Sequence, residues 1–279
     1  MTLTQHSAYE SAARYTQPFA RRLASPALSA SSGGGSEGLA QSHGLSAFGA
    51  RLSTLCGLST QEASMLKGFD RLPRSHPPQT EIKSDAAGPA SRIMVSGWAC
   101  RQRVLSDGRR QITSFILPGD IVGGPQQPEP PLDYSIMAVT QVVTVDASAL
   151  MAAVAGTDPI HRRLARAVRL LGQHEMISTY NQIVRLGRQT AYERMVHLML
   201  ELHERLRIAG KAGSDAFPLP LTQEVLSDAL GLSVVHVNRT MRQLKRDGLL
   251  EVYGGRVKIL DLNVMREIAD WIPAHGARQ

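Results

Sequence analysis

The chain has 279 residues, 43% of them hydrophobic, and a formal net charge of +7. This is enough for two domains and a packed core, and an isoelectric point near 9.8 favours a polyanionic partner. The sequence contains no run of 18 apolar residues and no long apolar N-terminal segment, so we expect neither a membrane span nor secretion.

The cysteine content and the motif content both argue against several functional classes. Two cysteines, Cys56 and Cys100, are too few for a disulfide framework and fit a reducing cytoplasm, where we expect the protein to act. The sequence has no Gly-rich phosphate loop, no H-E-x-x-H, no G-x-S-x-G and no clustered metal ligands. We therefore expect neither an enzyme nor a metal centre.

The N-terminal part divides into a tail and a helical segment. Residues 1–45 are rich in Gly, Ser and Ala, and we expect a disordered tail, with a misassigned start codon or a regulatory arm as alternatives. Residues 46–70 carry apolar side chains at helical spacing. Ser59 or Thr60, followed by Glu62, predicts the cap of a second helical piece.

Residues 71–155 show the pattern of a β domain. Short β-prone segments alternate with turn signals such as Ser106-Asp107-Gly108 and Pro118-Gly119-Asp120, which predicts a small barrel or jelly roll. The stretch from Leu72 to Ala90 is polar and rich in proline.

From Pro159 to Ile208 the pattern is helical. Six residues spaced alternately by three and four predict a short coiled-coil seam: Ala167, Leu170, His174, Ile177, Asn181 and Val184. The alternative is a helix packed on its own β domain. Leu186-Gly187 interrupts the spacing and predicts a hinge before a second helix.

The segment from Leu219 to Leu250 carries the strongest functional signal. Thr222 and Ser233 are good N-caps, and Gly231 is a good helix end, so two helices are joined by only three residues and must cross steeply. The runs around Gly254-Gly255 predict a β-hairpin. A helix-turn-helix followed by a hairpin is a winged helix, which places a helix in the major groove of DNA.

The second of these helices has one apolar stripe and a basic remainder. Val237, Met241 and Leu244, with Thr240 beside them, form the stripe. The residues on its other sides, which together with the N-cap Ser233 we expect to contact DNA, are His236, Asn238, Arg239, Arg242, Lys245 and Arg246.

This region resembles the DNA-binding end of the Crp/Fnr transcription regulators. The match to T-x-E-x-[LI]-x-x-x-x-G-x-S-x-x-x-V-x-R comprises Thr222, Glu224, Leu226, Gly231, Ser233, Val237 and Arg239. The β region also follows the order of that family's sensor domain, with Trp98-Ala99-Cys100-Arg101, then SDGRRQI, then LPGD. The resemblance thus covers the chain from about residue 50 onward.

The resemblance implies an α+β fold and a domain order. After the disordered tail 1–45 come a cyclic-nucleotide-binding-like double-stranded β-helix (jelly-roll) sensor domain over 46–158, a dimerisation helix over 159–187 and a winged helix-turn-helix over 188–279. The expected partners are double-stranded DNA, read as a palindrome by a homodimer, and RNA polymerase. The residues that read bases would be Val234, Val235, Asn238 and Arg239.

Two departures from the family pattern shape the functional hypothesis. Val235 stands where many members have a glutamate, so it can touch only a thymine methyl group, and the operator should differ there. Asp120 aligns with the family's ribose-contacting glutamate, but the phosphate-binding arginine is missing from Leu132–Ala138. We therefore expect no cyclic nucleotide, with Gly119 and Asp120 serving as turn residues.

Other cofactors are also not expected. An iron–sulfur cluster needs four cysteine ligands, which two cysteines in one chain cannot supply, so a cluster shared by two subunits is the alternative that stays open. The histidines show no haem pattern. Two rival hypotheses remain open: an effector- or redox-gated switch on the same scaffold, and a protein-interaction module that uses the winged helix.

Overall fold

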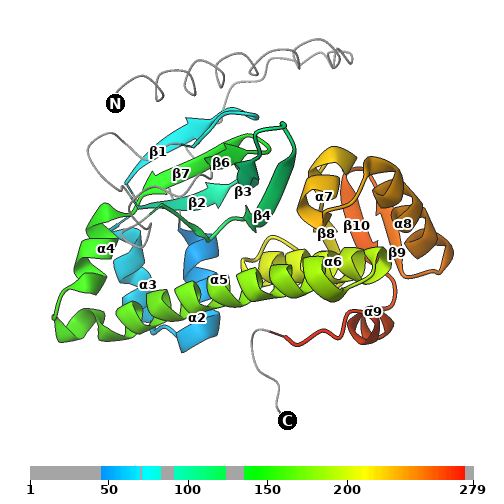
Figure 1. Cartoon of the computed structure of the whole chain (residues 1–279). Coiled ribbons are helices and arrows are strands. Elements are labelled where there is room, and N and C mark those ends of the chain that lie inside the picture. Colours follow the sequence, from blue (N-terminus) through cyan, green and yellow to red (C-terminus); the bar gives the residue numbers. More distant parts are fainter. Residues whose placement is uncertain (1–44, 70, 83–90, 124–134, 274–279) are drawn as a thin grey trace, which may run out of the picture.

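A β-sheet half and a helical half are joined by one long helix (Figure 1). The computed structural model describes residues 45–69, 71–82, 91–123 and 135–273. The proposed tail up to residue 44 and the stretch Leu132-Asp133-Tyr134 lie outside these ranges. Within them, no helix combines the length and apolarity needed to cross a bilayer.

Two antiparallel sheets form the sensor half, which confirms the predicted jelly-roll class. The first has the strand order β1-β7-β2-β5 and the second β4-β3-β6. Their bounds are β1 Arg71–His76, β2 Arg92–Ser96, β3 Ala99–Val104, β4 Arg110–Ile116, β5 Ile121–Val122, β6 Ser135–Ala138 and β7 Val142–Asp146. Apolar side chains from both sheets, among them Met94, Ile116 and Val142, form the core between them.

Strand β1 lies at the start of the predicted β region, in its polar, proline-rich stretch. Pro73 lies within it, and the strand pairs with β7 alone at the edge of the first sheet. An edge strand tolerates proline because its outward N–H groups need no ladder partner. The β prediction therefore extends to this stretch, although its composition is unusual for a strand.

Three helices flank the first sheet: α2 Ser46–Cys56, α3 Thr60–Lys67 and α4 Ser148–Ala155. Ser59 caps α3 through a capping box with Glu62, as expected. Leu45, assigned to the tail, is instead buried with Phe48, Leu52 and Leu164 in the core under these helices.

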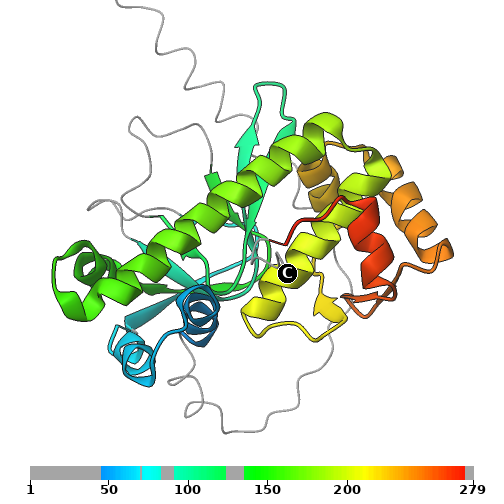
Figure 2. The ribbon, with the colours of Figure 1, turned by 90° about the horizontal axis from the view of Figure 1, so that it is seen from below.

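The long helix α5 (Arg162–Arg188) follows a short 3-10 turn at Pro159–His161 and crosses the molecule diagonally in Figure 2. The predicted hinge at Leu186-Gly187 is wrong, because α5 continues through both residues. The helix instead ends before Gln189. Thr190 and Glu193 form the capping box that begins α6 (Ala191–Ile208). A reciprocal cap defines a helix start more strongly than one glycine defines an end.

The remaining elements form the winged helix. They are β8 Ala216–Pro218, α7 Gln223–Leu230, α8 Val234–Arg246, β9 Leu250–Tyr253, β10 Arg256–Ile259 and α9 Leu262–Ile268. The three strands form one antiparallel sheet in the order β8-β10-β9.

The second sensor sheet is buried on both faces at the start of β3, where Ala99 and Cys100 lie. Along β3, Ala99 faces the inter-sheet core, whereas its neighbour Cys100 belongs to a different core with Trp98, Phe115 and residues of α6 such as Leu198. Successive strand residues point to opposite faces, so one sheet serves both cores. The sensor and the winged helix therefore share a continuous apolar core.

Candidate nucleic-acid interface

The helix-turn-helix starts and stops where the sequence predicts. The hydroxyl of Thr222 accepts a hydrogen bond from the Val225 amide at 3.2 Å, and that of Ser233 accepts one from the His236 amide at 3.3 Å. Gly231 ends α7 with φ of 61°, the left-handed conformation that favours glycine. These local signals confirm the two caps and the three-residue turn.

Helix α8 has one buried side and one free side. Val237, Thr240 and Leu244 are at most 5% exposed and pack against the winged-helix core. Of the nine residues predicted to contact DNA, Asn238 is half-buried and the other eight are exposed: Ser233, Val234, Val235, His236, Arg239, Arg242, Lys245 and Arg246. We call these nine the DNA face.

The cations of the DNA face have no partners in the part of the chain that the structure describes. Arg239, Arg242, Lys245 and Arg246 form no ion pair there, whereas arginines elsewhere, such as Arg110 and Arg205, pair with carboxylates. A solvated cation without a partner is available to a phosphate or to a guanine edge.

Asn238 is oriented by a residue that the sequence analysis missed. Its side-chain amide donates a hydrogen bond to the side-chain oxygen of Gln223, in the first turn of α7. No helical or strand spacing pairs two residues 15 positions apart, so only the crossing of the helices reveals this contact. The bond links the start of α7 to the exposed side of α8.

Val235 is the most exposed apolar residue of the DNA face, at 78%. It lies in the first turn of α8, beside the polar Asn238 and Arg239. Its two methyl groups can contact a thymine methyl but can neither accept nor donate a hydrogen bond. The structure thus places this residue where the proposed operator difference would arise.

The hairpin beyond α8 confirms the predicted wing. Strands β9 and β10 pair antiparallel, and Gly254 and Gly255 connect them with φ of 52° and 72°. Two successive positive φ values are the requirement of a type I′ turn. Tyr253 and Arg256 flank the turn and are exposed beside α8.

Comparison with known proteins supports this assignment of the interface. Residues 193–268 match the model of the Crp-like helix-turn-helix domain. The nitrogen fixation regulation protein FixK of Bradyrhizobium diazoefficiens is 30% identical over 215 residues, which cover 76% of this chain and 87% of that protein. The chain belongs to the Crp/Fnr family of transcription regulators.

Further members of the Crp/Fnr family agree in sequence and in structure. The transcriptional activator protein FnrL of Cereibacter sphaeroides is 30% identical over 173 residues, covering 58% of this chain and 65% of that protein. The solved structure of FixK2 from Bradyrhizobium japonicum superposes with a TM-score of 0.59 at 28% identity, covering 71% and 96%. This Crp/Fnr chain is therefore a DNA-binding regulator and not an enzyme.

In this Crp/Fnr regulator, Asp120 is more than a turn residue. Its carboxylate pairs with Arg51 of α2 and with Arg205 of α6, the latter at 2.7 Å, and accepts the Leu117 amide at 2.6 Å. Arg205 in turn contacts Glu201, which pairs with Arg185 of α5. Burial and the nearby Arg205 lower the pKa of Arg51 to about 9, so it remains a cation at neutral pH.

The two cysteines lie apart, and Cys100 is buried. Cys100 is 2% exposed, and burial raises its pKa to about 11, so it is a thiol at neutral pH. Cys56 lies in α2, in a different core from Cys100. Within the described residues, no group of three or more His, Cys, Asp or Glu side chains is arranged to hold a metal ion.

The predicted seam of α5 needs one correction. Ala167 is fully buried in the core of its own sensor half, with Leu164 and Leu171, so it cannot face a second chain. Ile177 and Val184 are exposed, and Leu170, His174 and Asn181 are half-buried. The predicted seam includes residues from both the buried side and the exposed side of α5, because its three-and-four spacing does not distinguish the two sides.

The structure adds apolar residues that the predicted seam did not include. Met176, Tyr180 and Ile183 are 55–61% exposed, and with Ile177 and Val184 they form a stripe on the side of α5 opposite its buried residues. We call these five residues the exposed stripe.

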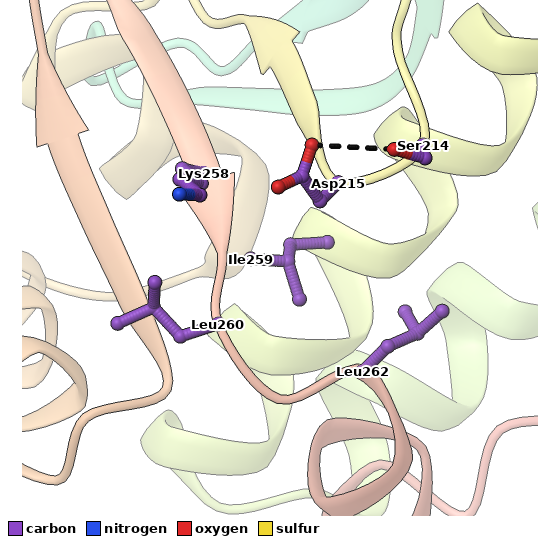
Figure 3. Close-up of a pocket in the computed structure, with 6 residues that line it drawn as sticks. All are labelled: Ser214, Asp215, Lys258, Ile259, Leu260 and Leu262. Atoms are coloured by element: carbon purple, nitrogen blue, oxygen red, sulfur yellow. Dashed lines mark hydrogen bonds between the residues drawn. The ribbon is translucent and has the colours of Figure 1, made fainter.

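An open pocket lies away from the DNA face. Its lining comes from the segment before β8, from β10 and the residue after it, and from the start of α9: Ser214, Asp215, Lys258, Ile259, Leu260 and Leu262 (Figure 3). Ser214 donates a hydrogen bond to Asp215 at 3.4 Å. No residue of α8 contributes to it, so it is separate from the interface.

Proposed function

We propose that this regulator acts as a homodimer on a palindromic operator. The observation that carries the proposal is the pair of unpartnered surfaces: the cationic DNA face of α8 and the exposed stripe of α5. A large apolar stripe on one helix side is characteristic of an interaction site. A second copy of α5 would cover it and place two copies of α8 on one DNA face.

In such a dimer the recognition helices would enter major grooves about 34 Å apart. Arg239 would read guanine through two hydrogen bonds, and Asn238, held by Gln223, would read an adjacent base. Arg242, Lys245 and Arg246 would contact phosphates, so that affinity falls steeply with salt, and His236 would lie nearer the backbone.

The proposal includes regulation without cyclic nucleotide and without an iron–sulfur cluster. Asp120, the residue aligned with a ribose contact, is already bound by Arg51 and Arg205. Cys100 is a buried thiol of raised pKa. FnrL is named a transcriptional activator, which favours RNA polymerase as a further partner in the cytoplasm.

Selection from random duplexes with the purified full-length protein, followed by sedimentation, tests this function. We expect an inverted repeat and a dimer, and no change in affinity when cyclic AMP is added. Ile183→Lys should dissociate the dimer and weaken palindrome binding, whereas Thr179→Lys, on an exposed position outside the stripe, should change neither. A single unrepeated half-site, or a dimer indifferent to Ile183→Lys, would contradict the proposal.

A further inference from the structure

The C-terminal end of α7 is held by side chains from three other elements. The last carbonyl groups of a helix have no partner within the helix. Here the carbonyls of Asp228, Ala229 and Leu230 accept from Gln111 of β4 at 2.8 Å, Gln182 of α5 at 2.7 Å and Arg194 of α6 at 3.0 Å. The sensor half thus supplies part of the cap of the first DNA-binding helix.

The contact from the sensor strand is reinforced by an ion pair. Arg110 donates to the Asp228 carboxylate at 2.7 Å, and both side chains are about two-thirds or more buried. Gln182 is 7% exposed, and its amide also reaches the Ile112 carbonyl of β4 at 3.3 Å. A single side chain therefore bridges the sensor strand and α7.

The turn of the helix-turn-helix is packed into the same junction. A Cβ atom on Gly231 would lie 3.2 Å from Leu186 of α5, 3.7 Å from Arg194 and 4.0 Å from Gln111. We call Arg110, Gln111 and Gln182, with their partners Asp228 and Ala229, the latch.

The latch removes the freedom that the Gln189-Thr190 link would otherwise allow. Rotation of the winged helix about that link would break the capping bonds, and it would expose apolar surface where Phe115 and Trp98 pack on α6. Buried carbonyls without partners are costly, so such a rotation would carry a free-energy penalty. The orientation of α8 relative to α5 is therefore fixed from the sensor side.

We propose that the latch makes Arg110, Gln111 and Gln182 positioning residues for operator spacing, by fixing how far apart a dimer presents its two recognition helices. This inference rests on the proposed homodimer. One base pair more or less between half-sites rotates them by about 34° relative to each other, because B-DNA repeats every 10–10.5 base pairs. A rigid winged helix cannot follow that rotation, whereas a released one can.

The test measures affinity of the full-length protein for duplexes whose half-sites are separated by the selected spacing and by one base pair more or less, at one salt concentration. The variants are Arg110→Met alone and with Gln182→Leu. Arg109→Met, in the same hairpin but paired only with Asp107 among the described residues, is the matched control because it removes the same charge.

The wild type and Arg109→Met should lose about tenfold in affinity when the spacing changes, comparable to a mismatched base pair. The latch variants should lose less than about threefold while keeping affinity for a single half-site, which a merely unfolded protein would not do. Exchanging the charges, with Arg110→Asp and Asp228→Arg together, should restore discrimination. Arg110 is partly exposed, so its single variant remains folded if the double variant does not.

Spacing discrimination in Arg110→Met equal to that of the wild type would overturn the inference, as would a wild type indifferent to spacing. A wild type that selects no inverted repeat at all would instead overturn the proposed function.

Discussion

The turn of the helix-turn-helix and the exposed side of its second helix differ in whether their polar groups have partners. At the C-terminal end of α7, carbonyl groups and the Asp228 carboxylate are all taken by side chains of β4, α5 and α6. On the DNA face of α8, Arg239, Arg242 and Lys245 have no ion-pair partner in the described chain. Satisfied groups hold the module in place, and unsatisfied but solvated groups are left for the ligand. Whether a polar side chain has a partner therefore distinguishes the residues that hold the motif in place from those of its interface.

The largest expected effect lies in the buried charges behind the motif. Arg185→Met should lower the free energy of unfolding by about 3–5 kcal/mol, because it removes a partner of buried Glu201. Denaturant unfolding measures it. Arg188→Met, three residues along at an exposed position of α5, should cost less than about 0.5 kcal/mol. Equal losses in the two variants would show that the buried Arg185–Glu201 pair does not stabilise the fold.

Acidification should weaken the same region through His197. Burial and then the charge of Arg185 lower its pKa to about 4, although Glu201 and Asp270 oppose the shift. The folded state therefore disfavours the proton that the unfolded chain binds below its ordinary pKa of about 6.5. Stability is complete above that value and falls as pH drops toward 4, by about 3 kcal/mol at most.

Unfolding measured from pH 7 to 4 checks this, with His197→Phe as the variant. The ring can still pack near Trp271, whose centroid lies 5.0 Å from that of His197, but no proton is exchanged. The variant should therefore lose less stability on acidification than the wild type. An unchanged pH slope would show that His197 does not contribute.

Gly231→Ala tests the junction itself and should cost about 2 kcal/mol. An alanine at φ of 61° is strained, and its Cβ would press on Leu186. Gly187→Ala is the matched control, since this glycine is helical and has no atom within 4 Å of an added Cβ. That control should stabilise by about 0.5–1 kcal/mol. The same sign in both variants, measured by thermal unfolding, would contradict the packing described.

The smallest effect is expected on the DNA face. Arg239→Ala should leave the free energy of unfolding unchanged, because its side chain is exposed. It should remove about 1.5 kcal/mol of discrimination at one base pair in each half-site. Selection from random DNA measures this, and Lys245→Ala should weaken all sequences alike. An Arg239→Ala variant that selects the wild-type motif would show that Arg239 does not read a base.

The sequence predicts the helix-turn-helix better than it predicts the long-range contacts that hold this motif in place. Thr222, Gly231, Ser233 and the Gly254-Gly255 turn are recognisable because caps and tight turns depend on neighbouring residues. The partner of Asp120 lies 85 residues away in α6, and no local pattern shows such a pair. The prediction that Ala167 lies in the dimer seam is wrong for a similar reason, because the rest of the fold decides which side of a helix is buried.

The Asp120 network also limits what protein engineering can do with this sensor. Adding an arginine to the sensor would not by itself create a nucleotide pocket, because the aligned acid already binds two cations. Replacing Asp120 would remove the carboxylate that pairs with Arg51 and one of the two carboxylates that pair with Arg205, in a largely buried site. Any redesign must therefore change α2, the β4–β5 turn and α6 together, although they are distant in the chain.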